Sequence, residues 1–226
     1  PFGTPDGSAK YGFGSSAALT VALVGALAAW FGAESGGEMP YMAHERFQST
    51  PGSGADIATS LAGGLIEYRL GGRTVTALDW PDDLHLALVF SGISASTGSM
   101  LAKLDPASVD YSELGRAAEN AAAAWSTGDA AKIVAATLDY GAALGKFDEQ
   151  NRIGIFEGGH AALVHAARHS AVAYKPCGAG GGDIGVVLGT SVAEVDAFVA
   201  AAAGQGFSRV DASIDMNGMA VSGARA

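Results

Sequence analysis

The first segment that could do chemistry is the glycine-serine stretch Lys10-Tyr-Gly-Phe-Gly-Ser-Ser-Ala-Ala18. Gly12 and Gly14 would let the backbone approach a ligand closely, and Ser15 and Ser16 are good N-cap residues for the apolar run that follows. The first N–H groups of a helix have no intrahelical partner and attract phosphate. The segment therefore predicts an anion site, although a purely structural turn could have the same spelling. It matches neither GxxxxGK[ST] nor GxGxxG after a strand.

The second segment is Gly52-Ser-Gly-Ala-Asp56, which delivers a carboxylate to the start of a predicted helix. Capping of that helix is the ordinary explanation for such an aspartate. The functional alternative is that Asp56 binds Mg²⁺ or accepts a proton from a substrate hydroxyl, since carboxylates take both roles in phosphoryl transfer. Lys10 could then neutralise charge on the transferring phosphoryl group.

The third segment is Lys175-Pro-Cys-Gly-Ala-Gly-Gly-Gly-Asp183. Such a density of glycine costs stability and is typical of a backbone that closely approaches something else. Cys177 has no histidine partner fixed by sequence and is predicted to be a small packed hydrophobe. The histidines show no HExxH pattern with a third ligand, so we expect ordinary helix-surface or core residues rather than a metal site; they are His44, His85, His160, His165 and His169.

The composition excludes several classes of protein. With 13 Lys+Arg against 23 Asp+Glu and a formal net charge of −10, a nucleic-acid partner is not expected. The apolar run Ala17–Phe31 is shorter than the roughly 20 residues of a membrane span, and it is predicted to be a central, fully buried helix because every face is apolar. The single cysteine and the lack of a secretory-type leader predict a cytoplasmic protein with no membrane partner. A homodimer is compatible with the sequence, which leaves the oligomeric state open.

The remaining elements follow from apolar periodicity and turn signals. Predicted helices are Ala17–Phe31, Met39–Gln48, Ile57–Ala62, Ser99–Leu104, Tyr111–Ser126, Ala130–Phe147, Glu157–His169 and Val192–Ala203. Predicted strands are Leu65–Leu70, Arg73–Leu78, Leu84–Phe90, Ala171–Lys175, Ile184–Leu188 and Ser208–Ile214. They interleave without a regular βαβ alternation, which predicts an α+β fold, and the turn-rich Asp79–Asp83 predicts a boundary near residue 80.

Taken together, the three segments resemble the motifs of the GHMP kinase superfamily, named for galactokinase, homoserine kinase, mevalonate kinase and phosphomevalonate kinase. The segment from Lys10 resembles its phosphate-binding second motif, and the segment from Lys175 resembles its third. The resemblance implies a two-domain α+β fold, with 1–80 as the C-terminal portion of a ribosomal S5-like, ATP-binding N-terminal domain and 81–226 as a ferredoxin-like C-terminal domain. No counterpart of the first motif is present, so we expect a segment ahead of Pro1 and a truncated first domain.

The resemblance also implies roles for individual residues. Lys10 and Asp56 would be catalytic, and Ser16 and Asp56 would lie at Mg²⁺. ATP would be bound by Gly12, Gly14, Ser15, Ser16, Ala17, Gly178, Ala179, Gly180 and Gly181. A small phosphorylated alcohol would be bound by Ser53, Ser96, Thr97, Gly182 and Asp183.

Within the superfamily, the spellings Gly-Phe-Gly-Ser-Ser and Gly-Ser-Gly-Ala-Asp are most similar to phosphomevalonate kinases. The implied reaction is ATP-dependent phosphorylation of 5-phosphomevalonate to 5-diphosphomevalonate, a step of the mevalonate pathway to isoprenoid precursors. Mevalonate kinase and the ATP-dependent diphosphomevalonate decarboxylase remain alternatives, as does a relative that binds a metabolite without catalysis.

Overall fold

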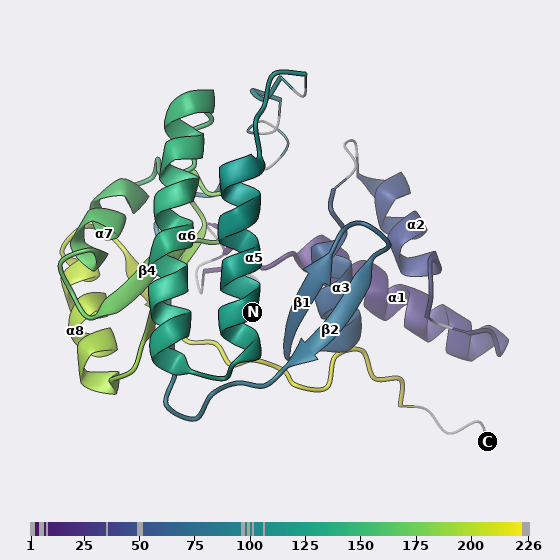
Figure 1. Cartoon of the computed structure of the whole chain (residues 1–226). Coiled ribbons are helices and arrows are strands. Elements are labelled where there is room, and N and C mark those ends of the chain that lie inside the picture. Colours follow the sequence, from purple (N-terminus) through teal and green to yellow (C-terminus); the bar gives the residue numbers. More distant parts are fainter. Residues whose placement is uncertain are drawn as a thin grey trace. The chain divides into compact units, whose positions relative to one another are not determined.

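The computed structural model describes residues 3–4, 7, 9–34, 36–48, 52–95, 98, 100, 102–105 and 107–222. The chain forms two compact units (Figure 1), one made of Pro1–Phe13 with Trp80–Ala212 and the other of Gly14–Asp79 with Ser213–Ala226. The larger unit is called unit 1 and the smaller unit 2. The chain crosses from one unit to the other after Phe13, after Asp79 and after Ala212. The division into GHMP domains at 80/81 stays a prediction.

Unit 1 is built on a four-stranded antiparallel sheet with strand order β4-β5-β3-β6. Its strands are β3 (His85–Phe90), β4 (Val172–Pro176), β5 (Ile184–Gly189) and β6 (Ser208–Val210). Leu88 at the middle of β3 pairs with Val186 on one side and Val210 on the other. The predicted strands are confirmed, except that β6 ends at Val210 rather than at Ile214.

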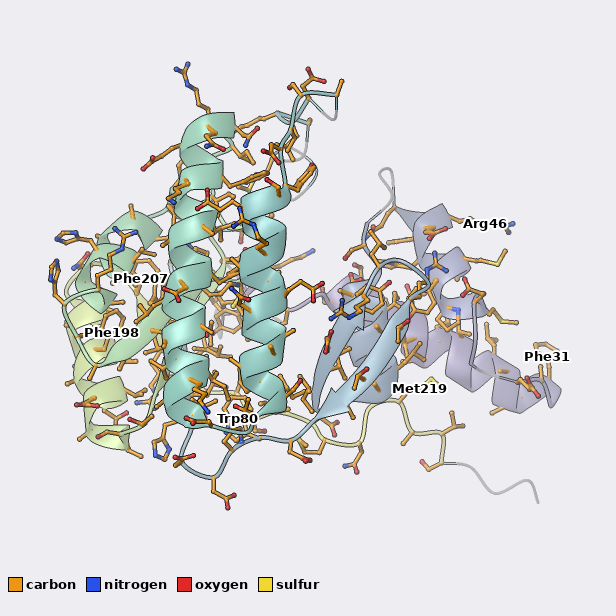
Figure 2. The ribbon with its side chains drawn as sticks, in the orientation of Figure 1. Phe31, Arg46, Trp80, Phe198, Phe207 and Met219 are labelled. Carbon is orange, nitrogen blue, oxygen red and sulfur yellow. The ribbon has the colours of Figure 1, made fainter. Side chains whose placement is uncertain are left out.

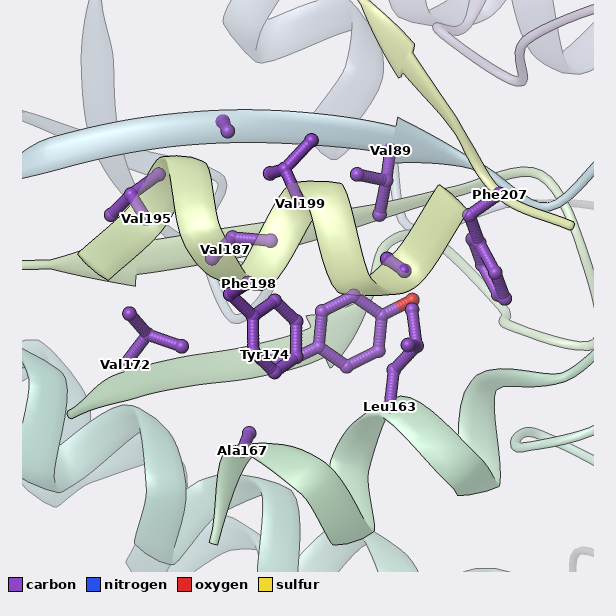
Figure 3. Close-up of a cluster of buried hydrophobic side chains, with 12 residues drawn as sticks. Val89, Leu163, Ala167, Val172, Tyr174, Val187, Val195, Phe198, Val199 and Phe207 are labelled. Atoms are coloured by element: carbon purple, nitrogen blue, oxygen red, sulfur yellow. The ribbon is translucent and has the colours of Figure 1, made fainter. Parts of the chain in front are cut away.

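Helices cover both faces of this sheet, and the alternation of side chains along each strand explains why. On β4, Val172 and Tyr174 pack with α7 (His160–Ala167) and α8 (Val192–Ala203), as Figure 3 shows. Ala173, between them, packs on the opposite face with α5 (Ser112–Ser126) and α6 (Ala130–Asn151). Fully burying one large apolar side chain is worth about 1.5–3 kcal/mol, so both apolar faces help to fix the strand register.

The described residues of unit 2 form three helices and a β-hairpin. They are α1 (Ser15–Phe31), α2 (Met39–Phe47), α3 (Ala55–Ala62), β1 (Leu65–Arg69) and β2 (Thr74–Leu78). Its core contains Ala17, Val21, Tyr41, Ile57 and Ala58. The Leu70 carbonyl accepts from the Arg73 N–H at 3.2 Å, which confirms the predicted Gly71-Gly72 turn between the two strands. The predicted helix Ser99–Leu104 in unit 1 falls partly outside the described residues.

The prediction of a fully buried α1 is wrong. Its small side chains, such as Ala17 and Ala28, are buried, but Leu19 and Leu23 are exposed and Phe31, labelled in Figure 2, is 76% exposed. An apolar residue at every position shows which faces a helix could bury, whereas burial also needs neighbours, and the described residues cover one face only. None of the helices in the described ranges is both long and apolar enough to cross a membrane.

Candidate functional site

The first glycine loop is shared between the two units, because the division falls between Phe13 and Gly14. Lys10 and Gly12 belong to unit 1 and the residues from Gly14 onward to unit 2. Each half of the loop is therefore described within its own unit.

The first N–H groups of α1 are available to a hydrogen-bond acceptor. Gly14 is the N-cap, in the left-handed conformation (φ 69°), and no side chain caps the helix. Ser15 and Ser16 were predicted as caps but are instead the first helical residues. The first intrahelical bond runs from the Ala18 N–H to the Gly14 carbonyl at 3.1 Å. The N–H groups ahead of Ala18 precede this ladder, which leaves them without an intrahelical acceptor.

The start of α3 has the same construction and lies against the start of α1. Gly54 is its N-cap, again left-handed (φ 79°) and without a side-chain cap. Asp56 in the first turn accepts a hydrogen bond from the Ile57 N–H at 2.9 Å through Oδ1. A Cβ placed on Gly14 would lie 3.4 Å from Asp56 Cβ. Two helix N-termini with their partial positive charge thus lie near one carboxylate.

Ala17 has a different role from its neighbours in the loop. The whole residue is 0% exposed, and its side chain packs in the core with Val21 and Ile57. The small size of Ala17 lets α1 and α3 approach closely, and its predicted contact with ATP stays a prediction.

Ser16 contacts a histidine that sequence reasoning had treated as ordinary. Ser16 Oγ lies 3.2 Å from His44 Nε2, and Gln48 Nε2 lies 3.1 Å from the same nitrogen. The His44 side chain is buried, with 4% exposure. The only signal in the sequence was that His44 and Gln48 are four residues apart and so share a helix face.

Ser53 organises the loop ahead of α3. Its hydroxyl accepts from the Ala55 N–H at 3.3 Å, and its carbonyl accepts from the Tyr68 hydroxyl at 2.8 Å. These contacts fix the loop, and the Ser53 hydroxyl satisfies the N–H of the first residue of α3. Its predicted role in substrate binding stays a prediction.

The oxygen ligands of unit 2 fit a hard cation in type. The Ser16 hydroxyl and the Asp56 carboxylate are the kind of donors that Mg²⁺ prefers, and Mg²⁺ usually completes its shell with waters and substrate phosphates. Within the described ranges, no group of three or more His, Cys, Asp or Glu side chains could hold a metal by itself. The residues therefore suit a cation that arrives with a phosphate ligand better than a dedicated metal cage.

In unit 1, Lys10 is fixed by its backbone. Its N–H donates to Ser94 Oγ at 3.3 Å and its carbonyl accepts from the same hydroxyl at 3.1 Å. The adjacent Tyr11 ring packs edge-on against Phe90 of β3, with centroids 5.2 Å apart. The Lys10 side chain is exposed, so a firmly held backbone carries a cation that can extend towards a ligand.

Gly12 brings the first glycine loop against the end of the third. Its backbone is left-handed (φ 80°), and a Cβ there would lie 2.5 Å from Asp183 Oδ2. Asp183 in turn caps the segment after β3, because its Oδ1 accepts from the Ala95 N–H at 3.1 Å. Burial raises the pKa of the Asp183 carboxyl, although the Ala95 hydrogen bond and His160 oppose that shift.

The third glycine loop connects β4 to β5, and its glycines mainly accommodate the protein's own chain. A Cβ on Gly180 would lie 2.3 Å from the Ile155 carbonyl oxygen, and the Gly181 N–H donates to that same oxygen at 2.8 Å. Gly178, by contrast, is exposed and would meet nothing within 4 Å. The close approach predicted from the sequence is present here as a contact with Ile155. The assignment of Ala179, Gly180 and Gly181 to ATP stays a prediction.

A second histidine that sequence reasoning missed holds the end of this loop. His160 is fully buried, and its Nε2 lies 2.8 Å from the Gly182 carbonyl oxygen, which can only accept. The ring must therefore carry its proton on Nε2 and accept from the Tyr174 hydroxyl, 2.6 Å from Nδ1. Burial lowers the pKa of His160 and raises the pKa of Tyr174, so both groups are neutral.

Two further predictions concern the same region. Cys177 packs beside the cluster of Phe90, Ile184 and Val210, and burial raises the pKa of its thiol. Its prediction as a small packed hydrophobe is confirmed. Ser96 and Thr97, predicted at the acceptor, lie outside the described residues.

Comparison with known proteins finds similarity to a family of kinases. Residues 5–64 match the GHMP kinases N terminal domain. A phosphomevalonate kinase from Streptomyces sp. (strain CL190) is 31% identical over 219 residues, which cover 79% of this chain and 57% of that protein. The chain thus spans little more than half the length of this relative.

Solved structures share the fold. The Lin0012 protein of Listeria innocua superposes with a TM-score of 0.83 at 20% identity, covering 94% of this chain and 69% of that one. The phosphomevalonate kinase of Streptococcus pneumoniae, in complex with phosphomevalonate and AMPPNP, gives a TM-score of 0.70 at 17% identity, covering 89% and 70%. Residues 5–64 are thus a segment of the GHMP kinase N-terminal domain, and the chain as a whole has the α+β fold of the GHMP kinases.

Proposed function

We propose that this chain is the ATP- and acceptor-binding part of a phosphotransferase that converts 5-phosphomevalonate to 5-diphosphomevalonate. The observation that carries the choice of substrate is the 31% identity to the Streptomyces phosphomevalonate kinase, which extends over most of this chain. The shared fold with an enzyme solved with phosphomevalonate and AMPPNP supports the choice of nucleotide.

The nucleotide phosphates would bind at the uncapped start of α1. Gly14 leaves the N–H groups of Ser15 and Ser16 ahead of the helical ladder, where backbone N–H groups and the helix dipole together favour an anion. Ser16 and Asp56 would hold Mg²⁺, which when bound would neutralise charge on the phosphates. Lys10 would contribute a further positive charge at the transferring group.

The chemistry of the proposed acceptor constrains the role of Asp56. In this reaction the bond between the γ-phosphorus and its bridging oxygen breaks, ADP leaves, and a new bond forms to an oxygen of the acceptor's 5-phosphate. A phosphate monoester has a second pKa of about 6 and is therefore largely doubly ionised at neutral pH. Its attacking oxygen needs no base, whereas an alcohol acceptor must lose a proton. Asp56 would therefore act on the cation and on positioning rather than as a proton acceptor.

The test is an ADP-release assay of the full-length protein with mevalonate, 5-phosphomevalonate and 5-diphosphomevalonate as separate substrates. We expect turnover with 5-phosphomevalonate and a diphosphate product without release of CO₂. Preference for mevalonate would replace the proposal with an alcohol kinase, and release of CO₂ from 5-diphosphomevalonate would replace it with a decarboxylase. Absence of nucleotide binding would favour a non-catalytic relative.

Asp56→Asn tests the role of the carboxylate within the same assay. If Asp56 acts through the cation, turnover of the variant should recover in part as Mg²⁺ is raised. A loss of about 10²-fold or more that no Mg²⁺ concentration relieves would instead indicate general-base catalysis. Asp129→Asn is a matched control, because Asp129 caps α6 by accepting from the Lys132 N–H and has no place in the proposed site.

A further inference from the structure

Two side-chain groups of unit 2 converge on one ring nitrogen of the buried His44. Its Nε2 lies 3.2 Å from Ser16 Oγ and 3.1 Å from Gln48 Nε2. The ring has 4% exposure, so these protein groups, rather than bulk water, decide which of its nitrogens carries the proton.

The orientation of the Gln48 amide indicates the tautomer of His44. An amide nitrogen can only donate, so with the Gln48 amide oriented as in the structure its Nε2 donates to His44 Nε2, which is then the unprotonated nitrogen. A ring with one proton then carries it on Nδ1. The other group within reach of Nε2 is the Ser16 hydroxyl, and a hydrogen bond between them requires Ser16 to donate its only proton.

This direction determines what Ser16 can offer to a ligand. With its proton directed to His44, Ser16 Oγ has only lone pairs left for other contacts. Lone pairs repel a phosphate oxygen and bind a hard cation. The phosphate would then be contacted by backbone N–H groups at the start of α1, while the side-chain oxygen would be reserved for the cation.

We propose that His44 is a positioning residue that, oriented by Gln48, holds the Ser16 hydroxyl as a cation ligand and not as a phosphate donor. The inference rests on the proposed function, because it concerns the cation that accompanies the nucleotide. It assigns a role in the site to His44 in α2 and to Gln48 directly after α2. Neither residue belongs to a glycine motif.

The first test reads the tautomer directly and needs no ligand. Long-range ¹⁵N–¹H correlation spectra of the full-length protein should show His44 protonated on Nδ1. His160 provides an internal reference, because its bond to the Gly182 carbonyl requires the proton on Nε2. A proton on Nε2 of His44 would reverse the direction of the Ser16 hydrogen bond and overturn the proposal.

The second test measures binding of AMPPNP by calorimetry, with Mg²⁺ and with a chelator in its place. His44→Phe should weaken binding about tenfold with Mg²⁺, the range expected when a group that orients a metal ligand is lost, and should leave metal-free binding unchanged. Gln48→Leu should show the same pattern in weaker form. His169→Phe is the matched control, since His169 is exposed and its ring packs on His165 in unit 1.

A double-mutant cycle separates positioning from a general packing effect. If His44 acts through Ser16, adding His44→Phe to Ser16→Ala should cause no further loss of Mg²⁺-dependent affinity. Equal losses with and without Mg²⁺, or additive losses in the double variant, would overturn the role of His44. Failure of the wild-type protein to bind AMPPNP with Mg²⁺ would overturn the proposed function itself, whereas wild-type binding that His44→Phe leaves unchanged would overturn only this inference.

Discussion

The two glycine loops are alike in sequence but differ in what their glycines do. In the first loop, Gly14 leaves α1 without a side-chain cap and so frees backbone donors. In the third loop, Gly180 makes room for the Ile155 carbonyl and Gly181 for the Met100 side chain, whereas Gly178 faces open space. A glycine-rich spelling therefore shows that something approaches closely. Whether that is a ligand or the protein itself depends on the neighbours that the fold supplies.

The two buried histidines repeat this contrast with opposite tautomers. His44 contacts a side chain of the first loop and has its proton on Nδ1, because Gln48 donates to Nε2. His160 contacts a carbonyl of the third loop and has its proton on Nε2. His44 is placed to orient the hydroxyl of Ser16, a candidate cation ligand, whereas His160 holds the third loop in its conformation. Changes in the first loop should therefore affect turnover, and changes in the third should first affect stability.

The largest expected effect is on catalysis by Lys10. Lys10→Met should lower kcat of the full-length protein by about 10²–10³-fold, because it removes a positive charge aimed at the transferring phosphoryl group. The free energy of unfolding should change little, since Ser94 is bonded to backbone groups of Lys10. Steady-state kinetics and urea titration measure the two quantities. Lys132→Met, at an exposed ion pair with Asp129, is the control, and unchanged turnover in Lys10→Met would remove Lys10 from the site.

The next effect tests the opposite loop. Gly180→Ala should lower the free energy of unfolding by about 3 kcal/mol, because the residue has a positive φ and its Cβ would overlap the Ile155 carbonyl oxygen at 2.3 Å. Gly178→Ala also has a positive φ but meets open space, so about 1 kcal/mol is expected. Urea denaturation compares them. Equal losses would mean that contact with Ile155 does not explain the glycine at position 180.

Removal of one hydroxyl should have a smaller effect. Tyr174→Phe keeps the packing of the ring but leaves His160 Nδ1 buried without its donor, at a cost of about 1–3 kcal/mol. Tyr140→Phe is the matched control, since Tyr140 is partly buried beside the cluster of Leu144, Phe147 and Ile155 and lacks this histidine contact. Thermal or urea unfolding would show the difference, and a loss no greater than in the control would argue against the His160 hydrogen bond.

The smallest expected effect is on the pH dependence of stability. Burial lowers the pKa of His160 below its usual 6.5, so the unfolded chain binds a proton that the native protein excludes. The stability from neutral His160 is present above pH 6.5 and falls as the pH decreases towards its native pKa. The raised pKa of Asp183 contributes with the opposite sign at lower pH. Its native carboxyl holds a proton that the unfolded chain has lost, so this part of the stability falls as the pH rises. His160→Gln should flatten the plot of unfolding free energy against pH just below pH 6.5. An unchanged plot would mean that another group causes the pH dependence there.

Much of the fold could be predicted because it follows from local rules. Glycine-bounded apolar runs gave the helices of unit 2, and short β-branched runs gave the strands of the sheet. The exposure of Leu19 and Phe31 on α1 could not be predicted, because hydrophobicity shows which surface could be buried and not which neighbours are present. The roles of His44 and His160 were missed for a similar reason, since five histidines looked alike until their partners were known.

The sequence by itself determined the chemistry available to this protein: three motifs in order, a lysine ahead of the first, and a carboxylate at the start of a helix. Those features depend on residue type and spacing along the chain, and they were sufficient to indicate the family. Only the tertiary structure decided that Ser16 faces His44, that Gly12 lies against Asp183, and that Ile155 fills the space at Gly180. These are contacts between residues far apart in sequence, and their geometry exists only after the chain has folded.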